Sequence, residues 1–266
     1  MQFVLGISIG VLISLLAWRV GALSSSGAVA AAISGGLIFG IGHWPWAALL
    51  LTFFVSSSAL SKLFRSRKVG SSEKFAKGNQ RDWAQVLAND GVGVMLVLVL
   101  IFRPDRSWIW IAYAGAMAAV NADTWATELG VLSPKPPRLI TNGQVVEAGT
   151  SGGISLMGTL ASLAGAALIG AVAAASFPRE RILFPIAAAT LGGVCGSLFD
   201  SLLGATGQAI YNCPVCQKET ESHPLHSCGA ETVQIRGWSW LDNDLVNFLA
   251  SVVGAVIAVG VWGWLR

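Results

Sequence analysis

Six acidic side chains lie inside or at the edges of long apolar segments, where carboxylates are uncommon. A charge in hydrocarbon is costly, so such residues usually face a polar cavity and carry function. Taken singly, each is equally compatible with a helix cap or an interface contact. Together they come from four segments and fall toward one side of the membrane, which favours a shared cation site. They are Asp90, Asp123, Glu128, Asp200, Asp242 and Asp244.

Helical geometry and ligand chemistry indicate which metal these carboxylates suit. Asp123 and Glu128 do not share one stripe of a helix, so both reach one site only if its polar face is broad. Asp242 is placed to cap a helix on which Asn243 and Asn247 stack. Hard oxygen ligands suit Mg²⁺, which proteins usually hold with one or two carboxylates and substrate phosphates. The predicted magnesium ligands are Asp123, Glu128, Asp200 and Asp244.

A glycine-rich segment precedes one apolar run and has the composition of an anion site. In Glu147-Ala-Gly-Thr-Ser-Gly-Gly-Ile-Ser155, the glycines free backbone N–H groups at a helix start, with Thr150, Ser151 or both as caps. A helix start that binds nothing has a similar composition, but the neighbouring carboxylates favour phosphate. The predicted phosphate-binding residues are Gly149, Thr150, Ser151, Gly152, Gly153 and Ser155.

A basic loop over 62–83 supplies the cations. Lys and Arg favour cytoplasmic loops, and this rule places the loop and most of the 17 Lys and Arg residues inside, with both chain ends outside. The same rule fully explains Lys62 to Lys74. Lys77 and Arg81 are better candidates for neutralising phosphate charge, because they adjoin the polar start of the next helix.

The elements that must position these residues are membrane helices. The chain has 266 residues, of which 54% are hydrophobic and 12% charged, and its mean hydropathy is +0.64. Soluble domains carry about 25% charged residues, so a cytosolic enzyme, a nucleic-acid binder and a disordered chain are excluded. A spanning helix needs about 20 mostly apolar residues. Candidates run over 2–22, 26–42, 46–60, 84–102, 108–132, 152–177, 182–211 and 243–265.

We therefore predict an all-α fold: a polytopic transmembrane bundle of about seven to eight helices, forming a single transmembrane domain over 1–266. The second and third segments are short and meet at Gly42-His43-Trp44-Pro45, which suggests a tight helical hairpin. The protein is expected to be a multi-pass integral membrane protein whose site faces the cytoplasm. Its oligomeric state does not follow from the sequence.

A predicted cytoplasmic insertion over 212–241 is rich in cysteine and histidine. A Cys-x-x-Cys knuckle followed by two histidines and a cysteine offers five ligands for a four-coordinate Zn²⁺. A reducing compartment disfavours a disulfide. A structural zinc that folds the loop is the favoured interpretation, and a reduced, metal-free loop is the alternative. The candidate ligands are Cys213, Cys216, His223, His226 and Cys228.

Four motifs carry a resemblance to a known family. They are Asn121-Ala-Asp-Thr-Trp-Ala-Thr-Glu-Leu-Gly130, Gly149-Thr-Ser-Gly-Gly-Ile-Ser155, Leu198-Phe-Asp-Ser-Leu-Leu-Gly-Ala-Thr206 and Asn243-Asp-Leu-Val-Asn247. With them the chain resembles, over nearly its whole length, the integral membrane family that includes the phytyl-phosphate kinase of the tocopherol pathway. More remotely it resembles the CTP-dependent polyprenol and dolichol kinases and the CDP-diacylglycerol synthases. Those relatives carry a Lys-Thr-x-Glu-Gly-Ser-type element where this chain has Gly149-Thr-Ser-Gly-Gly.

The resemblance implies a prenyl-phosphate kinase that transfers the γ-phosphoryl group of CTP to an isoprenoid monophosphate, such as phytyl or geranylgeranyl phosphate, and gives the diphosphate. Phosphoryl transfer depends on positioning and charge neutralisation, and an acceptor that is already anionic needs no general base. The implied partners are CTP, the lipid phosphate and the membrane, without nucleic acid, and Mg²⁺ is the implied cofactor. The predicted catalytic residues are Asp123, Glu128, Asp200, Lys77 and Arg81, and Asn121, Asn243 and Asn247 join the nucleotide-binding residues.

Three other functions remain open at this point. A prenol kinase and a CTP:phospholipid cytidylyltransferase use similar residues, and their products distinguish them, because the transferase releases pyrophosphate and the kinase releases CDP. A secondary transporter is the alternative from another class, since intramembrane carboxylates also mark ion pathways. Transporters, however, commonly have inverted repeats and midplane sites, and the carboxylates here gather at one surface.

Overall fold

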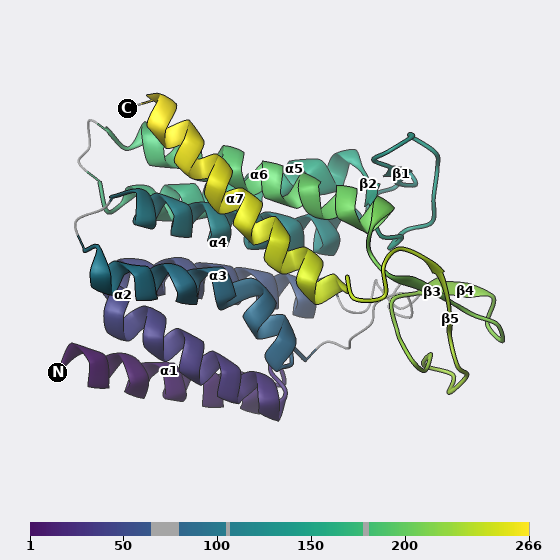
Figure 1. Cartoon of the computed structure of the whole chain (residues 1–266), viewed down its shortest axis with the longest axis horizontal. Coiled ribbons are helices and arrows are strands. Elements are labelled where there is room, and N and C mark those ends of the chain that lie inside the picture. Colours follow the sequence, from purple (N-terminus) through teal and green to yellow (C-terminus); the bar gives the residue numbers. More distant parts are fainter. Residues whose placement is uncertain (65–79, 105–106, 178–180, 266) are drawn as a thin grey trace.

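A computed structural model describes residues 1–64, 80–104, 107–177 and 181–265. Within these ranges the chain folds into seven helices that run roughly side by side (Figure 1). Six of them are long and apolar enough to cross a membrane, which confirms the predicted helical membrane bundle. The helices are α1 Gln2–Arg19, α2 Ser25–Phe64, α3 Trp83–Phe102, α4 Ser107–Gly130, α5 Leu156–Ala174, α6 Leu183–Thr206 and α7 Asn243–Leu265.

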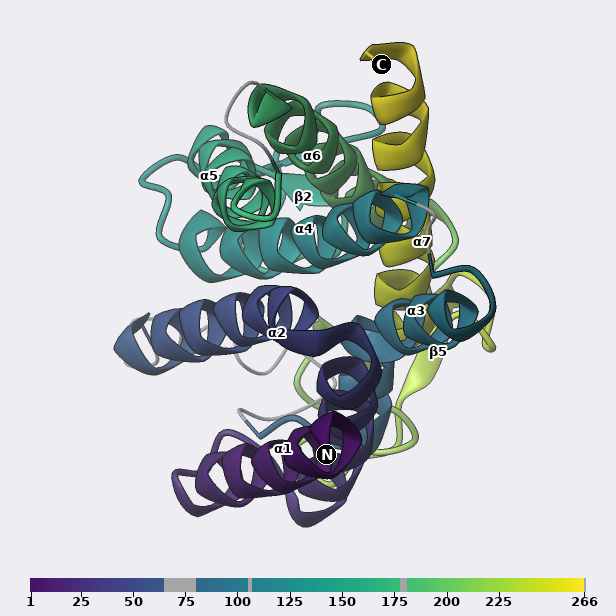
Figure 2. The same ribbon diagram turned by 90° about the vertical axis from the view of Figure 1, so that its left-hand side faces the viewer.

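Helix α2 contains the predicted hairpin. Its backbone leaves the helical region at His43, where φ is 63° and ψ is −167°, two residues before Pro45. The two arms on either side of this residue fold toward each other, because a Cβ placed on Gly35 would lie 3.8 Å from Cδ2 of Leu50. Figure 2 shows the two arms running in different directions. The predicted spans 26–42 and 46–60 are therefore the two arms of α2.

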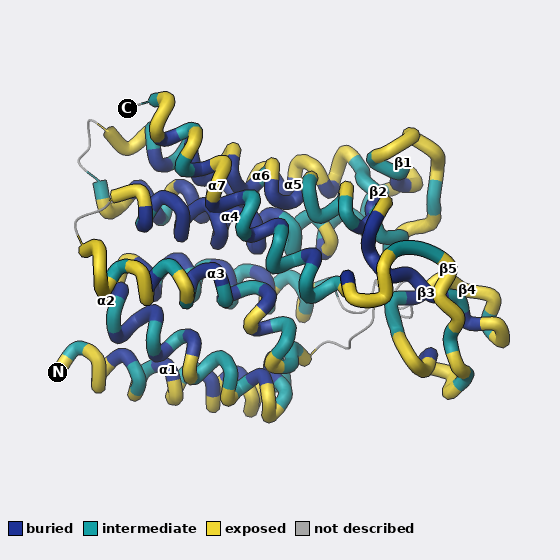
Figure 3. The backbone as a smooth tube through the Cα atoms, in the orientation of Figure 1, coloured by how far each residue is buried: buried dark blue, intermediate teal, exposed yellow. Residues whose placement is uncertain are grey.

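Helix α4 is the centre of the bundle. It packs against α2, α3, α5, α6 and α7, and its first two thirds are almost wholly buried (Figure 3). Its sequence is rich in alanine and glycine, whose small side chains allow helix backbones to approach closely in a membrane. Since the other helices shield α4 from lipid, it needs less hydrophobicity than they do, and it is the helix that falls outside the six most apolar ones.

Both chain ends lie at one end of the bundle, and the short strands lie at the other (Figure 1). The strand-bearing end also holds the C-terminal ends of α4 and α6 and the N-terminal ends of α3, α5 and α7. The helices thus alternate in direction as the predicted topology requires. The assignment of the strand-bearing end to the cytoplasm stays a prediction.

The connecting segments contain short strands that the sequence analysis did not anticipate. Strand β1 (Arg138–Leu139) pairs antiparallel with β2 (Gly153–Ile154), between α4 and α5. A second sheet lies between α6 and α7, with the order β4-β3-β5: β3 is Ile210–Cys213, β4 is Lys218–Thr220 and β5 is Val233–Arg236. The predicted helix over 182–211 therefore ends early, at Thr206, because the chain enters this sheet.

The predicted start of the helix over 152–177 is also wrong. Neither Thr150 nor Ser151 caps it. Helix α5 begins at Leu156, and Ser155 is its N-cap, since the Ser155 side chain accepts a hydrogen bond of 3.1 Å from the backbone N–H of Gly158. The glycine-rich segment therefore lies before the helix: its first part is an irregular loop, and Gly153–Ile154 forms β2.

Close packing around α4 gives a direct test of this architecture. A Cβ on Gly254 of α7 would lie 2.6 Å from Cβ of Ala119 and 2.7 Å from the carbonyl oxygen of Gly115, whereas a Cβ on Gly260 would meet nothing within 4 Å. Overpacking costs about 1–3 kcal/mol. We expect Gly254→Val to lower the thermal unfolding midpoint of the purified protein in detergent, and Gly260→Val on the same helix to leave it unchanged. Equal midpoints for the two variants would contradict this packing.

Candidate functional site

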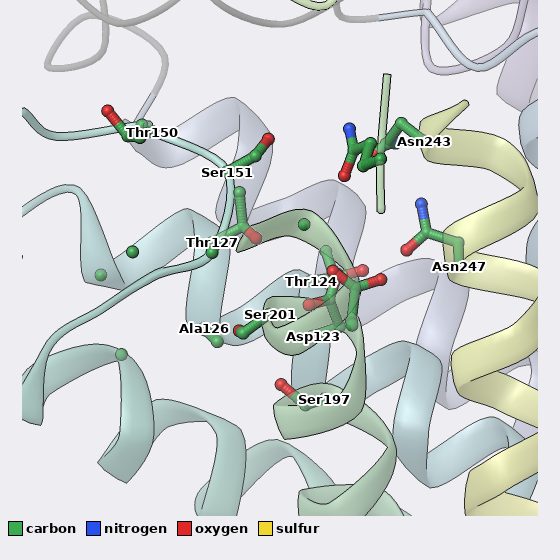
Figure 4. A pocket seen from close by; sticks show the side chains of 18 of the residues that line it. Asp123, Thr124, Ala126, Thr127, Thr150, Ser151, Ser197, Ser201, Asn243 and Asn247 are labelled. Atoms are coloured by element: carbon green, nitrogen blue, oxygen red, sulfur yellow. The ribbon is translucent and has the colours of Figure 1, made fainter. Parts of the chain in front are cut away.

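A cavity of about 860 Å³ opens among the helix ends on the strand-bearing side. Its walls come from α4, α5, α6 and α7, from the first turns of α3, and from the loop before α5 (Figure 4). Most of the residues predicted from the sequence gather here. Those that line the cavity are Arg81, Asp123, Glu128, Gly149, Thr150, Ser151, Gly152, Gly153, Ser155, Asp200, Asn243, Asp244 and Asn247.

The polar face of α4 is broad, as a common site requires. Asp123 and Glu128 both line the cavity although they lie on different stripes of the helix. Glu128 accepts a hydrogen bond of 2.6 Å from Ser61 near the end of α2. The carboxylates of Asp123 and Glu128 therefore reach one chamber from two stripes of α4.

Asp200 on α6 brings a second carboxylate to Asp123. The two side chains lie close enough for their charges to interact. The Oδ2 atom of Asp200 is buried and has no hydrogen-bond partner in the described part of the chain. A buried anionic oxygen that lacks a partner is costly, so this corner of the cavity suits a cation.

Arg81 is the cation that the structure places at the cavity wall. Its backbone pairs with the turn after α1, through hydrogen bonds to Ala22 and Ser24. Its side chain donates to Ser57 over 3.0 Å and lies over the ring of Phe53, 5.1 Å from the ring centre. The other terminal nitrogen, Nη1, is buried and has no hydrogen-bond partner among the described residues.

The charge of Arg81 is secure. Burial lowers the pKa of its guanidinium, while the carboxylates of Asp90 and Glu128 act in the opposite direction. Arginine is not deprotonated in proteins. The cavity therefore holds a fixed cation with donor capacity to spare. Lys77, the other predicted cation, lies outside the described residues.

The glycine-rich loop forms the rim of the cavity. Gly149 and Gly152 both have φ of +82°, a conformation that side chains with a Cβ rarely adopt. Within the described part of the chain, the backbone N–H groups of Gly149, Ser151 and Gly152 donate no hydrogen bond. A loop that lines a polar cavity with spare N–H donors is a suitable cradle for an anion.

Helix α7 adds amide and carboxylate groups at its first turns. Asp242 caps the helix, as predicted, because its Oδ1 accepts a hydrogen bond of 2.9 Å from the backbone N–H of Leu245. Asn243, Asp244 and Asn247 line the cavity, and Figure 4 shows the two asparagines extending from α7 on the side of Asp123.

Two residues from the sequence analysis do not line the cavity. Asn121 is fully buried between helices: its Nδ2 donates to the Gly165 carbonyl over 2.8 Å and its Oδ1 accepts from Ser56 over 3.0 Å. The amide nitrogen and the amide oxygen of Asn121 both form hydrogen bonds between helices, so its side chain stabilises helix packing and does not face a nucleotide. Asp90 is buried elsewhere and accepts a hydrogen bond of 3.1 Å from Ser34.

Glu221 is a site residue that sequence reasoning missed. It follows β4, lines the cavity, and its Oε1 accepts hydrogen bonds from Ser151 over 2.7 Å and from Gln208 over 2.8 Å. Its charge also acts on Asp123 and Asp200. The sequence gives no signal that separates Glu221 from the exposed Glu219 two residues earlier, because the path of the insertion alone brings one of them inward.

The insertion gathers a compact group of possible metal ligands. The ligand atoms of Cys213, Cys216, His226 and Cys228 all lie within 4.8 Å of one another. The predicted fifth ligand, His223, does not join them. It stacks on the ring of Tyr211, with 4.4 Å between the ring centres, and lines the cavity instead. The backbone N–H of Cys216 donates to Cys213 Sγ, and this hydrogen bond lowers the pKa of the Cys213 thiol.

The long apolar helices agree with the family comparison. The family described as integral membrane protein DUF92 matches residues 8–255. This chain belongs to that family. The match covers all seven helices at least in part, and it confirms the family resemblance that the sequence motifs carry.

The chain is also similar to several individual proteins. Protein PGR of Arabidopsis thaliana is 34% identical over 271 residues, which cover 94% of this chain and 92% of that protein. An uncharacterized membrane protein of Methanocaldococcus jannaschii is 32% identical, with 89% of this chain and 84% of that protein covered. Protein VTE6, chloroplastic, of Arabidopsis thaliana is 24% identical, with 89% and 64% covered. No solved structure matches this chain.

The seating of the glycine-rich loop can be tested with two glycines of the same loop region. Gly143 and Gly152 both have positive φ, but a Cβ on Gly152 would lie 2.5 Å from the backbone N of Ala205 on α6, whereas one on Gly143 would meet nothing within 4 Å. Both alanine variants carry a backbone cost of roughly 1 kcal/mol, and only Gly152→Ala also displaces the loop from α6. We expect Gly152→Ala to lower the unfolding midpoint further than Gly143→Ala. Matching midpoints would show that the loop does not rest on α6.

Proposed function

We propose that this protein is a membrane prenyl-phosphate kinase, which transfers the γ-phosphoryl group of CTP to an isoprenoid monophosphate. The observation that carries the proposal is one chamber that joins several carboxylates, a glycine-rich loop and the half-buried Arg81, with an apolar pocket beside it. The family resemblance supplies CTP and the lipid class. The chamber supplies the places where each part of the reactants would bind.

The carboxylates fit a magnesium ion. Asp123, Asp200 and Glu221 repel one another at close range, and Asp200 has a buried oxygen without a hydrogen-bond partner in the described ranges. Both conditions are relieved by a bound cation, and oxygen ligands suit Mg²⁺. We assign the metal to Asp123 and Asp200, with Glu128 and Asp244 at its margin. Bound there, Mg²⁺ would neutralise charge on the phosphates of CTP.

The glycine-rich loop and α7 are the proposed nucleotide site. The backbone N–H groups of Gly149, Ser151 and Gly152, which donate no hydrogen bond within the described residues, would bind phosphate oxygens. Asn243 and Asn247 extend toward the same space from the opposite wall (Figure 4). An anion between these elements would also lie near the metal ligands, as the transfer of a terminal phosphoryl group requires.

The acceptor lipid is assigned to Arg81 and the pocket behind it. A small apolar pocket of about 70 Å³ lies among α1, the two arms of α2, and α3, and Arg81 and Asn89 line both this pocket and the main chamber. The guanidinium of Arg81, a residue that lines both spaces, would bind the acceptor phosphate. The first part of the isoprenoid chain would then enter the apolar pocket, and the rest would extend into lipid.

With these assignments, the acceptor oxygen and the CTP phosphates bind in one chamber. The reaction between them requires no proton transfer. An acceptor phosphate is already ionised, so Arg81 needs only to orient it, while the metal ligands and the loop hold the donor.

A prenol kinase is the second candidate, and the position of His223 is the observation that favours it. A hydroxyl acceptor benefits from a base, and His223 lines the chamber. A transporter is less compatible with the structure, because the chamber lies at the helix ends rather than at the bilayer midplane. The acceptor used by the purified protein distinguishes the two kinases.

The decisive assay gives purified protein γ-labelled CTP with phytyl phosphate, and in parallel with phytol. We expect label in the diphosphate, dependence on Mg²⁺, and CDP as the second product. Asp123→Asn and Asp200→Asn should each lower kcat by roughly 100-fold or more, since each removes a proposed ligand of the metal that would neutralise charge on the transferred group. Glu231→Gln, an exposed change outside the chamber, is the control. Full activity in Asp123→Asn, or labelled product from phytol alone, would refute this assignment.

The acceptor pocket makes a separate prediction. Ala31 lines it, and Ala31→Phe would fill the space that the isoprenoid chain needs. We expect KM for phytyl phosphate to rise by roughly tenfold, with KM for CTP unchanged. Val55→Phe, which enlarges an exposed side chain of the same helix α2, should alter neither constant. A rise in both constants for Ala31→Phe would indicate general disruption and not an acceptor pocket.

A further inference from the structure

The four ligand atoms of the insertion lie within 4.8 Å of one another, and two of their separations are close to those of a tetrahedral zinc site. With Zn–S bonds of about 2.3 Å and a Zn–N bond of about 2.0 Å, tetrahedral angles put two sulfurs about 3.8 Å apart and a sulfur and a nitrogen about 3.5 Å apart. Here Cys213 Sγ lies 3.6 Å from Cys228 Sγ, and His226 Nδ1 lies 3.3 Å from Cys228 Sγ. The backbone N–H of Cys216 points at Cys213 Sγ over 3.4 Å. The side chains are thus already arranged around one point.

The insertion has little else to stabilise it. Many of its apolar side chains are exposed, including Val215, Leu225, Val233 and Ile235. Units below about 40 residues seldom bury enough surface to fold alone, and they usually need a metal or a disulfide. The cysteines are free thiols in this structure. A metal ion is therefore the element that would hold β3, β4 and the loop around His226 together.

We propose that Cys213, Cys216, His226 and Cys228 bind one structural zinc ion, and that this zinc-held insertion uses Glu221 to fix the glycine-rich loop at the rim of the chamber. The metal site and the contact between Glu221 and Ser151 are linked, because Glu221 lies in the sequence between the two pairs of zinc ligands. Cys216 precedes it by five residues and His226 follows it by five. The zinc therefore holds both ends of the segment that carries Glu221.

Glu221 connects three parts of the molecule. Its Oε1 accepts one hydrogen bond from Ser151 in the glycine-rich loop and another from Gln208, which lies just after α6. Hydrogen bonds to a charged acceptor are roughly twice as strong as neutral ones. Arg236 of β5 adds a second anchor, since its Nη1 donates to the carbonyl of Ala205 over 2.9 Å. The insertion is thereby held against α6 and the loop, and Glu221 acts as a positioning residue through Ser151.

The metal is tested on the full-length protein, purified in detergent without added zinc. Elemental analysis should find one zinc per chain. His226→Ala and Cys213→Ser should lose it, while His223→Ala, a change of the same kind three residues away, should keep it. Exchange of the wild-type metal for Co²⁺ should give the visible absorption of a tetrahedral thiolate site, which checks the geometry even if a variant fails to fold. No zinc in the wild-type protein, a Cys213–Cys228 disulfide, or equal zinc loss in both histidine variants would overturn the site.

The contact is tested by hydrogen exchange of the backbone N–H groups of Thr150 and Gly153, which donate hydrogen bonds within the glycine-rich loop. Glu221→Ala should speed exchange there by roughly tenfold or more, the effect expected from losing a charge-assisted hydrogen bond. Glu221→Gln keeps an acceptor for Ser151 and should retain most of the protection, and Glu219→Ala on the same hairpin should change nothing. All three variants should keep their zinc. Unchanged exchange in Glu221→Ala, or Gln as impaired as Ala, would overturn the positioning role. Neither measurement depends on kinase activity, so a failure of the proposed function would be seen separately.

Discussion

The cost of gathering several carboxylates in one chamber governs the rest of this structure. Asp123 and Asp200 project from membrane helices, and Glu221 joins them from the insertion, so several half-buried acidic groups share one chamber. Neighbouring charges of one sign are stabilised by a cation or by strong donors. The chamber lies at the ends of the helices, where polar loops can reach it. The carboxylates, the loop and Arg81 are therefore parts of one electrostatic arrangement.

The helix packing makes that arrangement possible. Small residues on α4, α6 and α7 bring three backbones together: Gly192 and Gly254 would each clash with a neighbouring helix if they carried a Cβ. Tight packing below the chamber fixes the directions of Asp123 and Asp200. At the other wall, Arg81 precedes α3 and lies outside any helix. Backbone hydrogen bonds to Ala22 and Ser24 hold it in place. A site assembled in this way has a tightly packed base.

The insertion contacts the glycine-rich loop at the rim of the chamber. This contact explains why a polar segment outside the helices is part of a site in a membrane protein. Ser151 and Gln208 both bind Glu221, so the loop before α5 and the end of α6 are connected through a segment that neither helix contains. The glycines allow the loop its unusual backbone, since Gly152 packs against Ala205 with positive φ. The glycines give the loop its backbone conformation, and the hydrogen bond from Ser151 to Glu221 holds the loop in place.

Much of this molecule is determined locally and could be predicted from the sequence. Hydrophobic length gives the spans, Pro45 and its neighbours mark the hairpin in α2, and Asp242 caps α7 as its position suggests. The candidate carboxylates and the glycine-rich loop also follow, because few other reasons place such residues in apolar surroundings. The helix start at Ser155 and the end at Thr206 did not follow, since several residues nearby have equal capping or helical tendencies.

Only the tertiary structure decided which of these residues meet. It separated Asn121 and Asp90 from the chamber, chose His226 over His223 for the cysteine cluster, and brought Glu221 beside Ser151, a residue 70 positions earlier. Spacing along the chain fixes neighbours within one helix or knuckle, because their geometry is periodic. It does not fix contacts between elements, which depend on how helices pack and on the path of the connecting strands.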